Sequence, residues 1–203
     1  MHLLITLLAA ISPALPAPSG VGLSEAEMAE ALAGKVPTRS EAFTNARGKS
    51  AGRGIGAIVI DRPVADVWAT LSHYEDRAEY VPHLKKVTVL DKQSPTRLRV
   101  CQEIDATVTT ARYTAWYDLD AVAHVIHWKM DDTATTNTLV DVDGDYRMFD
   151  LGPARTLLVY RSYVDTGLKL TRFIQSYIAT RSMPDLLRAI KKRVESGGKW
   201  KKT

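Results

Sequence analysis

Hydrophobic and polar residues alternate along most of the middle of the chain, between about residues 86 and 165. Turn-forming segments such as Ser94-Pro95 and 131–137 divide this region into stretches of strand length. Because successive side chains of a strand point to opposite faces of a sheet, the pattern predicts an antiparallel meander with one buried face. Residues 54–61, which are more continuously apolar, predict the first strand of the same sheet.

A helical period follows this first strand. Val64, Val67 and Leu71 lie on one face of a helix that Pro63 can begin. A second short helix is predicted over residues 75–80. The order of elements is therefore a strand, two short helices and then the meander.

The C-terminal part of the chain returns to a helical period. From Leu170 to about Glu195, apolar residues recur three and four positions apart. This spacing predicts a long helix whose apolar stripe covers the buried face of the sheet. Pro184 lies within the stripe, so we expect a kink or a restart of the helix there.

The region before the first strand has three parts. Residues 1–20 hold an apolar run that is too short to span a bilayer and is followed by small residues and prolines. We expect this segment to be a signal peptide and the protein to be exported, to a periplasm or outside the cell. No Lys or Arg precedes the run, and without a signal peptide the protein would be cytoplasmic. Ser24 and Glu27 have the spacing of a capping box and predict a short helix over residues 25–33. Residues 35–53 are polar and rich in Gly and Ser, so we expect a connecting arm.

The alternation decides which side chains face the interior of the sheet. The chosen parity places aliphatic and aromatic side chains inside, with several tyrosines among them. For residues 111–119 a rival register would instead bring Arg112 and Trp116 inside. Buried phenols need hydrogen-bond partners, which water or a ligand can supply in a cavity. We therefore predict a ligand cavity, with a fully packed core as the alternative. The predicted lining residues are Leu98, Val100, Ile104, Tyr113, Tyr117, Ile126, Trp128, Met130, Tyr146, Met148, Leu158, Tyr160, Phe173 and Tyr177.

Composition narrows the classes of function. A net charge of +4 is a mild basic excess, which argues against a nucleic-acid partner. Cys101 is the single cysteine, so the chain can form no internal disulfide and no zinc site with several cysteines. We expect a monomer whose partner is a hydrophobic small molecule.

Candidate catalytic and metal-binding residues are few. His73 and His83 flank an acidic cluster over residues 75–79, but this spacing does not place them on one helix face. The cluster is better explained as the solvated face of a short helix, so we expect no metal and no cofactor. No nucleophile motif such as Gly-x-Ser-x-Gly is present. His124 and Arg112 are the residues that could serve an acid–base reaction in a cavity.

The C-terminus is basic. Residues 197–203 carry three lysines around Trp200 and follow a helix end that is also basic. Cations at a helix C-terminus offset the helix dipole. The same charges, with a tryptophan among them, could instead contact an anionic membrane surface.

Several segments together resemble one known superfamily. They are DRPVADVWATL at 61–71, VPHLKKVTVL at 81–90, DGDY at 143–146 and MPDLLRAIKKRV at 183–194. In their order along the chain they resemble the START-like helix-grip superfamily, also called SRPBCC. The branch most similar holds the polyketide cyclase/dehydrase and lipid transport proteins and the coenzyme Q-binding START-like proteins.

The resemblance implies an α+β fold in which a curved antiparallel sheet wraps around a long C-terminal helix and encloses a hydrophobic cavity. It covers about residues 54–196, which we take as the ligand-binding domain. Residues 21–53 would be an N-terminal helix and connecting arm, and residues 197–203 a basic tail.

Three hypotheses of function follow from these patterns and from the resemblance. The first is binding, transport or presentation of a lipid, quinone or polyketide. The second is a cyclase or dehydratase that acts on a polyketide-like or aromatic substrate in the same cavity. The third is an interaction module of the cell envelope with a filled core.

Overall fold

A computed structural model describes residues 21–105, 110–167 and 172–203, with side chains from residue 182 onward in the last range. The predicted signal peptide, residues 1–20, lies outside these ranges and stays a prediction. The fold is α+β, as expected. Its helices and strands are α1 (Glu25–Leu32), β1 (Thr38–Thr44), β2 (Ser50–Ile60), α2 (Val64–Ser72), α3 (Arg77–Tyr80), β3 (Leu84–Ser94), β4 (Arg97–Asp105), β5 (Thr110–Asp120), β6 (Val125–Met130), β7 (Asp141–Asp150), β8 (Thr156–Asp165) and α4 (Arg172–Glu195).

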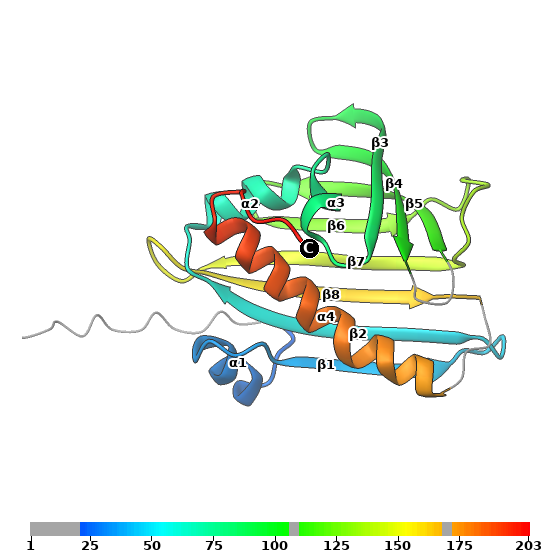
Figure 1. Ribbon diagram of the computed structural model, residues 1–203, viewed down its shortest axis with the longest axis horizontal. Helices are drawn as coiled ribbons and strands as arrows, with labels where there is room; N and C mark the ends of the chain where they lie inside the picture. The colour runs from blue at the N-terminus through cyan, green and yellow to red at the C-terminus, as the bar shows by residue number, and fades with distance from the viewer. Residues whose placement is uncertain (1–20, 106–109, 168–171) are drawn as a thin grey trace, which may run out of the picture.

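The strands form one 8-stranded antiparallel sheet in the order β1-β2-β8-β7-β6-β5-β4-β3. Figure 1 shows α4 lying diagonally across one face of this sheet, with α2 and α3 beside its C-terminal end. Leu187, Ile190 and Val194 of α4 belong to the main hydrophobic core. The arrangement confirms the helix-grip prediction. Helix α4 runs through Pro184 without a restart. None of the helices in the described ranges is long and apolar enough to cross a membrane.

The predicted parity of the meander is confirmed in β4, β5, β6 and β7. In β5, Tyr113 and Tyr117 are buried, which excludes the rival register. Trp116 lies on the other face, where the guanidinium groups of Arg97 and Arg99 stand 4.9 and 5.9 Å from its ring. Alternation was decisive here because only one face of the sheet is covered by α4.

The expectation of a connecting arm over residues 35–53 is wrong. Residues 38–44 form β1, which pairs with β2 from Thr38 opposite Gly56 to Thr44 opposite Ser50. Their turn is closed by Asn45, whose side-chain oxygen accepts hydrogen bonds from two backbone amides. Backbone pairing stabilises an edge strand without an apolar face, and this is why hydrophobic periodicity missed it. The sheet thus begins before residue 54.

The predicted helix over 25–33 is confirmed as α1, with its capping box between Ser24 and Glu27. It packs on the face of the sheet opposite α4 and covers a second, smaller core. That core contains Met28 of α1 and Leu157 and Val159 of β8. The outward-facing positions of β8 are therefore buried here, which the alternation of the meander did not predict.

Gly144 of β7 is the glycine whose replacement we expect to cost most. A Cβ there would overlap the indole of Trp128, with Cε2 only 2.7 Å away, and the carbonyl oxygen of Arg161. Gly144→Ala should lower the free energy of unfolding by about 1–3 kcal/mol, as measured by urea denaturation, because a packed strand cannot move aside. Gly52→Ala is the matched control, since its Cβ would meet only the Glu41 carbonyl at 3.5 Å. Equal losses in the two variants would contradict the expectation.

Candidate ligand-binding site

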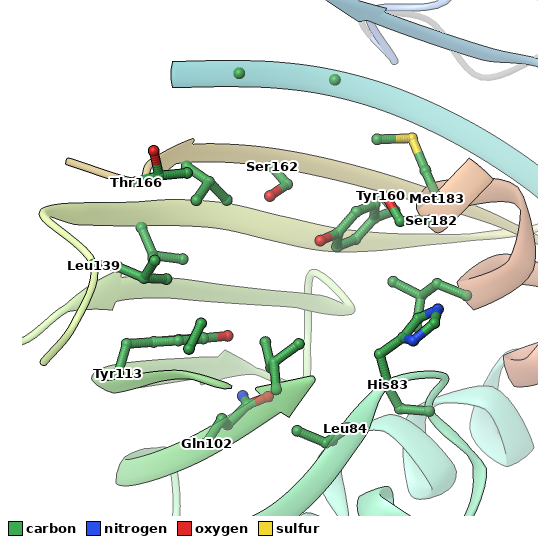
Figure 2. A pocket seen from close by; sticks show the side chains of 18 of the residues that line it. His83, Leu84, Gln102, Tyr113, Leu139, Tyr160, Ser162, Thr166, Ser182 and Met183 are labelled. Atoms are coloured by element: carbon green, nitrogen blue, oxygen red, sulfur yellow. The ribbon is translucent and has the colours of Figure 1, made fainter. Parts of the chain in front are cut away.

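A cavity with a volume of about 400 Å³ lies between the covered face of the sheet and the helices. Its wall combines strands β1, β2 and β4 to β8 with Arg77 of α3, the segment from Val81 to Leu84 and residues 182–186 of α4. Figure 2 shows side chains from these separate elements converging on one space. The volume falls in the range of about 300–1,000 Å³ that is typical of small-molecule sites.

The predicted lining residues divide into two groups. One group lines the cavity: Ile104, Tyr113, Tyr117, Trp128, Tyr146 and Tyr160. The other group belongs to the packed hydrophobic core and does not reach the cavity: Leu98, Val100, Ile126, Met130, Met148 and Leu158. Phe173 and Tyr177 lie outside the described side chains. The inner face of the sheet therefore borders packed core in one part and the cavity in another. The ligand cavity and the packed core, which the sequence left as alternatives, each describe part of it.

The phenols of the cavity are partnered by protein groups. Tyr113 hydrogen-bonds to Tyr117, whose oxygen also accepts from the Gln102 amide. Tyr160 bonds with Ser162. These phenols therefore do not depend on water or a ligand for their hydrogen bonds, contrary to our expectation. Burial raises the pKa of Tyr113 well above its usual range, so its hydroxyl stays protonated. In Figure 2 the Tyr113 and Tyr160 hydroxyls point into the cavity from opposite sides.

Sequence reasoning missed several residues of the wall. Gln102 lies between Val100 and Ile104 on the same face of β4, and the alternation alone could have identified it. Ser162 lies two residues after Tyr160 on the same face of β8, so the alternation could have identified it as well. Arg77 gave no such signal, because in the sequence it stands in a run of charged residues that we assigned to solvent.

The acidic cluster is not simply a solvated face, contrary to the prediction. In the described part of the chain, no group of His, Cys, Asp and Glu side chains could hold a metal ion. Asp76 and Glu79 both pair with Arg193 of α4, and His73 lies 3.4 Å from Asp76. His83 stands at the cavity wall with a left-handed φ of 61°. The cluster thus joins α3 to the long helix.

The two residues proposed for acid–base chemistry lie elsewhere. Arg112 pairs with Glu103 on the outer face of the sheet. His124 follows β5 and packs edge-on against Trp68, with ring centroids 5.9 Å apart. Neither belongs to the cavity wall. The residues that supported the cyclase or dehydratase hypothesis are therefore not brought to the site.

The basic tail is docked against the segment that follows α3. The backbone amide of Lys202 donates to the Glu79 carbonyl at 2.9 Å, and its ammonium donates to the carbonyls of Val81 and Leu84. The Trp200 carbonyl accepts from Arg193 at 2.9 Å. Lys202 thus holds the segment that forms one side of the cavity, and Trp200 ties the tail to α4.

The docked tail should loosen in acid. The hydrogen bond from Lys201, supported by the charge of Arg193, lowers the pKa of Glu79. A lowered pKa in the folded state adds stability above the unfolded pKa of about 4.3, and this stability is lost as pH falls through the folded value. The emission of Trp200, taken as the difference in tryptophan fluorescence between wild type and Trp200→Phe, should therefore show a transition between pH 6 and pH 3. Lys201→Met should move this transition to higher pH. An unchanged transition in Lys201→Met would contradict the assignment.

Comparisons with known proteins agree with this architecture. The sequence profile described as polyketide cyclase/dehydrase and lipid transport matches residues 56–195. No curated protein matches the sequence significantly. Among solved structures, the Zhui aromatase/cyclase from Streptomyces sp. R1128 is 21% identical, with a TM-score of 0.60 over 78% of this chain and 94% of its own. A START superfamily protein from Mycobacterium smegmatis is 15% identical, with a TM-score of 0.60 over 71% and 97%. Human StAR-related lipid transfer protein 5 is 12% identical, with a TM-score of 0.58 over 85% and 94%.

The profile covers more than half of the chain, so the chain belongs to the polyketide cyclase/dehydrase and lipid transport family. The structural similarities confirm the START-like helix-grip fold. The narrower resemblance to coenzyme Q-binding proteins stays a prediction.

Proposed function

We propose that this member of the polyketide cyclase/dehydrase and lipid transport family binds one hydrophobic small molecule in its internal cavity and shields it from water. The observation that carries the proposal is the cavity itself, about 400 Å³ in volume and lined mainly by aliphatic and aromatic side chains, with polar and charged ones such as Gln102, Arg77 and Asp105 among them. Burial of apolar ligand surface, at about 25 cal/mol per Å², would drive binding. The hydroxyls of Tyr113 and Tyr160 would orient the polar end.

Two of the similar structures support the class of ligand. One is a lipid transfer protein by name and the other an aromatase/cyclase. We favour binding over cyclase or dehydratase chemistry because His124 and Arg112, the residues selected for that chemistry, are absent from the cavity wall. A catalytic role would have to use other side chains.

Native mass spectrometry of the protein purified from its own host tests the proposal. We expect a bound molecule of defined mass that denaturation releases. Titration of the emptied protein with lipids and quinones, followed by tryptophan fluorescence, should show saturable binding, because Trp128 lines the cavity. Protein that is both empty as isolated and unresponsive to every ligand would overturn the proposal.

For the basic tail we propose a structural role in place of contact with an anionic membrane. Lys201 pairs with Glu79 at 3.0 Å, and Lys202 is bound to two carbonyls, so both ammonium groups already have partners within the protein. Charge reversal at the exposed Lys199 should leave binding to phosphatidylserine vesicles unchanged in a flotation assay. A marked loss of binding in Lys199→Glu would restore the membrane hypothesis.

A further inference from the structure

Arg77 stands out among the buried residues of the cavity wall. It is the first residue of α3, is 4% exposed and lines the cavity. Arginine keeps its charge in folded proteins, and a buried charge is normally paired with an opposite one. The partners of Arg77 therefore indicate whether the site is complete without a ligand.

Among the described residues, the contacts of Arg77 are all to neutral groups. Its Nη2 donates to the Tyr146 hydroxyl at 3.2 Å, while its Nε has no hydrogen-bond partner. The guanidinium lies 4.8 Å from the ring centroid of Tyr74 and 5.6 Å from that of Tyr146. No carboxylate of the described residues forms an ion pair with it. The segments 1–20, 106–109 and 168–181 contain no Asp or Glu.

The neighbouring phenols do not supply the missing negative charge. Burial raises the pKa of Tyr80 to about 12 and also raises that of Tyr146 and Tyr74. All three hydroxyls are therefore neutral at physiological pH. The phenols of Tyr74 and Tyr80 are themselves buried without a partner. A desolvated cation thus sits among neutral rings at the wall of an empty space.

Arg193 shows how the same fold treats a buried arginine that has only a structural role. It is 5% exposed, and its Nε, like that of Arg77, has no hydrogen-bond partner. Its guanidinium nevertheless pairs with both Asp76 and Glu79 and also bonds to the Trp200 carbonyl. Asp76 is the residue directly before Arg77 in the chain, yet its carboxylate turns to Arg193. The difference between the two arginines is that Arg77 borders the cavity and Arg193 does not.

We propose that the ligand of this cavity carries a carboxylate, or a comparable anionic oxygen group, on an apolar body, and that this group pairs with the guanidinium of Arg77. The inference rests on the proposed function and names its ligand class. Arginine can present two parallel N–H donors to one carboxylate, and such charge-assisted bonds are strongest where water is excluded. The apolar wall accommodates the body of the ligand, and Tyr146 keeps the guanidinium oriented.

Matched acids and methyl esters test the inference. Titrations at pH 7.5 would use dodecanoate against methyl dodecanoate, and naphthoate against methyl naphthoate. Wild type should bind each acid at least about tenfold more tightly than its ester. Arg77→Met should bind the two within about threefold, with the ester affinity retained. Arg77→Lys keeps the positive charge but loses the two parallel N–H donors of the guanidinium. Its preference for acid over ester should therefore fall between those of wild type and Arg77→Met. Arg188→Met is the control. It removes an exposed positive charge from the same domain and should behave as wild type.

Thermal unfolding separates ligand recognition from a structural role. Without ligand, Arg77→Met should have a Tm no lower than wild type, because it removes an unpaired buried charge. Dodecanoate should raise the Tm of wild type and leave that of Arg77→Met nearly unchanged. A large fall in the Tm of ligand-free Arg77→Met would assign a structural role to Arg77 and count against the inference.

The outcomes distinguish the two levels of proposal. Equal binding of acids and esters by wild type would overturn the anionic ligand and leave the binding function intact. Failure of all four probes and of a neutral apolar dye to bind would overturn the binding function itself. The wild-type ratio decides the first question even where Arg77→Met folds poorly.

Discussion

Replacing Arg193 by methionine is expected to lower the free energy of unfolding by about 3 kcal/mol. Arg193 is 5% exposed, and its guanidinium joins α4 to two other parts of the chain, to Asp76 and Glu79 around α3 and to the carbonyl of Trp200 in the tail. Breaking a buried ion pair typically costs about 3–5 kcal/mol because a charge is left without its partner. We place the loss at the low end, since the two carboxylate side chains keep 32% and 39% exposure.

Urea denaturation followed by circular dichroism measures this loss. Arg188→Met is the matched control on the same helix. Arg188 is exposed and forms an ion pair with Asp185 at 3.3 Å, so its removal should change stability by less than about 0.5 kcal/mol. Equal stability of the two variants would mean that the contacts of Arg193 do not hold α3 and the tail against α4.

Filling the cavity should abolish binding without unfolding the protein. Val164 of β8 is half-buried and lines the cavity. The ring of Val164→Phe would occupy ligand space, so affinity for a neutral apolar dye such as N-phenyl-1-naphthylamine should fall at least tenfold, or about 1.4 kcal/mol. The free energy of unfolding should change little, because empty space receives the added atoms.

Val100→Phe is the matched comparison, because it enlarges a side chain in the packed core and not at the cavity wall. Val100 is fully buried on the same inner face and belongs to the packed core, away from the cavity wall. The same enlargement there should lower the free energy of unfolding by about 1–3 kcal/mol through overpacking. If Val164→Phe destabilises as much as Val100→Phe and leaves dye binding intact, the cavity is not the binding site.

The fold was largely predictable because its signals are local. Alternation in β4 to β8 and the helical stripe of α4 depend on residues two to four positions apart, and burial on one face makes these patterns strict. The hairpin of β1 and β2 was missed because its register depends on backbone pairing between Thr38–Thr44 and Ser50–Gly56, which leaves no periodic trace in side-chain polarity.

The candidate site was predictable only in part. Parity places Tyr113, Tyr146 and Tyr160 on the inner face, and it would have placed Gln102 there as well. Parity cannot tell whether an inner residue meets another side chain or an empty space. Trp128 lines the cavity and Ile126, two residues earlier on the same strand and face, is in solid core. That distinction depends on what α2 and α4 bring from far away in the chain.

The sequence by itself therefore determined the helix-grip architecture, the inner face of the sheet and the apolar character of what that face encloses. Only the tertiary structure decided where the interior is hollow and which charges meet there. Arg77 and Arg193 both appear in the sequence as members of charged runs, yet both are buried, and only Arg193 receives carboxylates. The physical reason is that periodicity reports a residue's face, whereas packing and ion pairing depend on distances between residues remote in sequence.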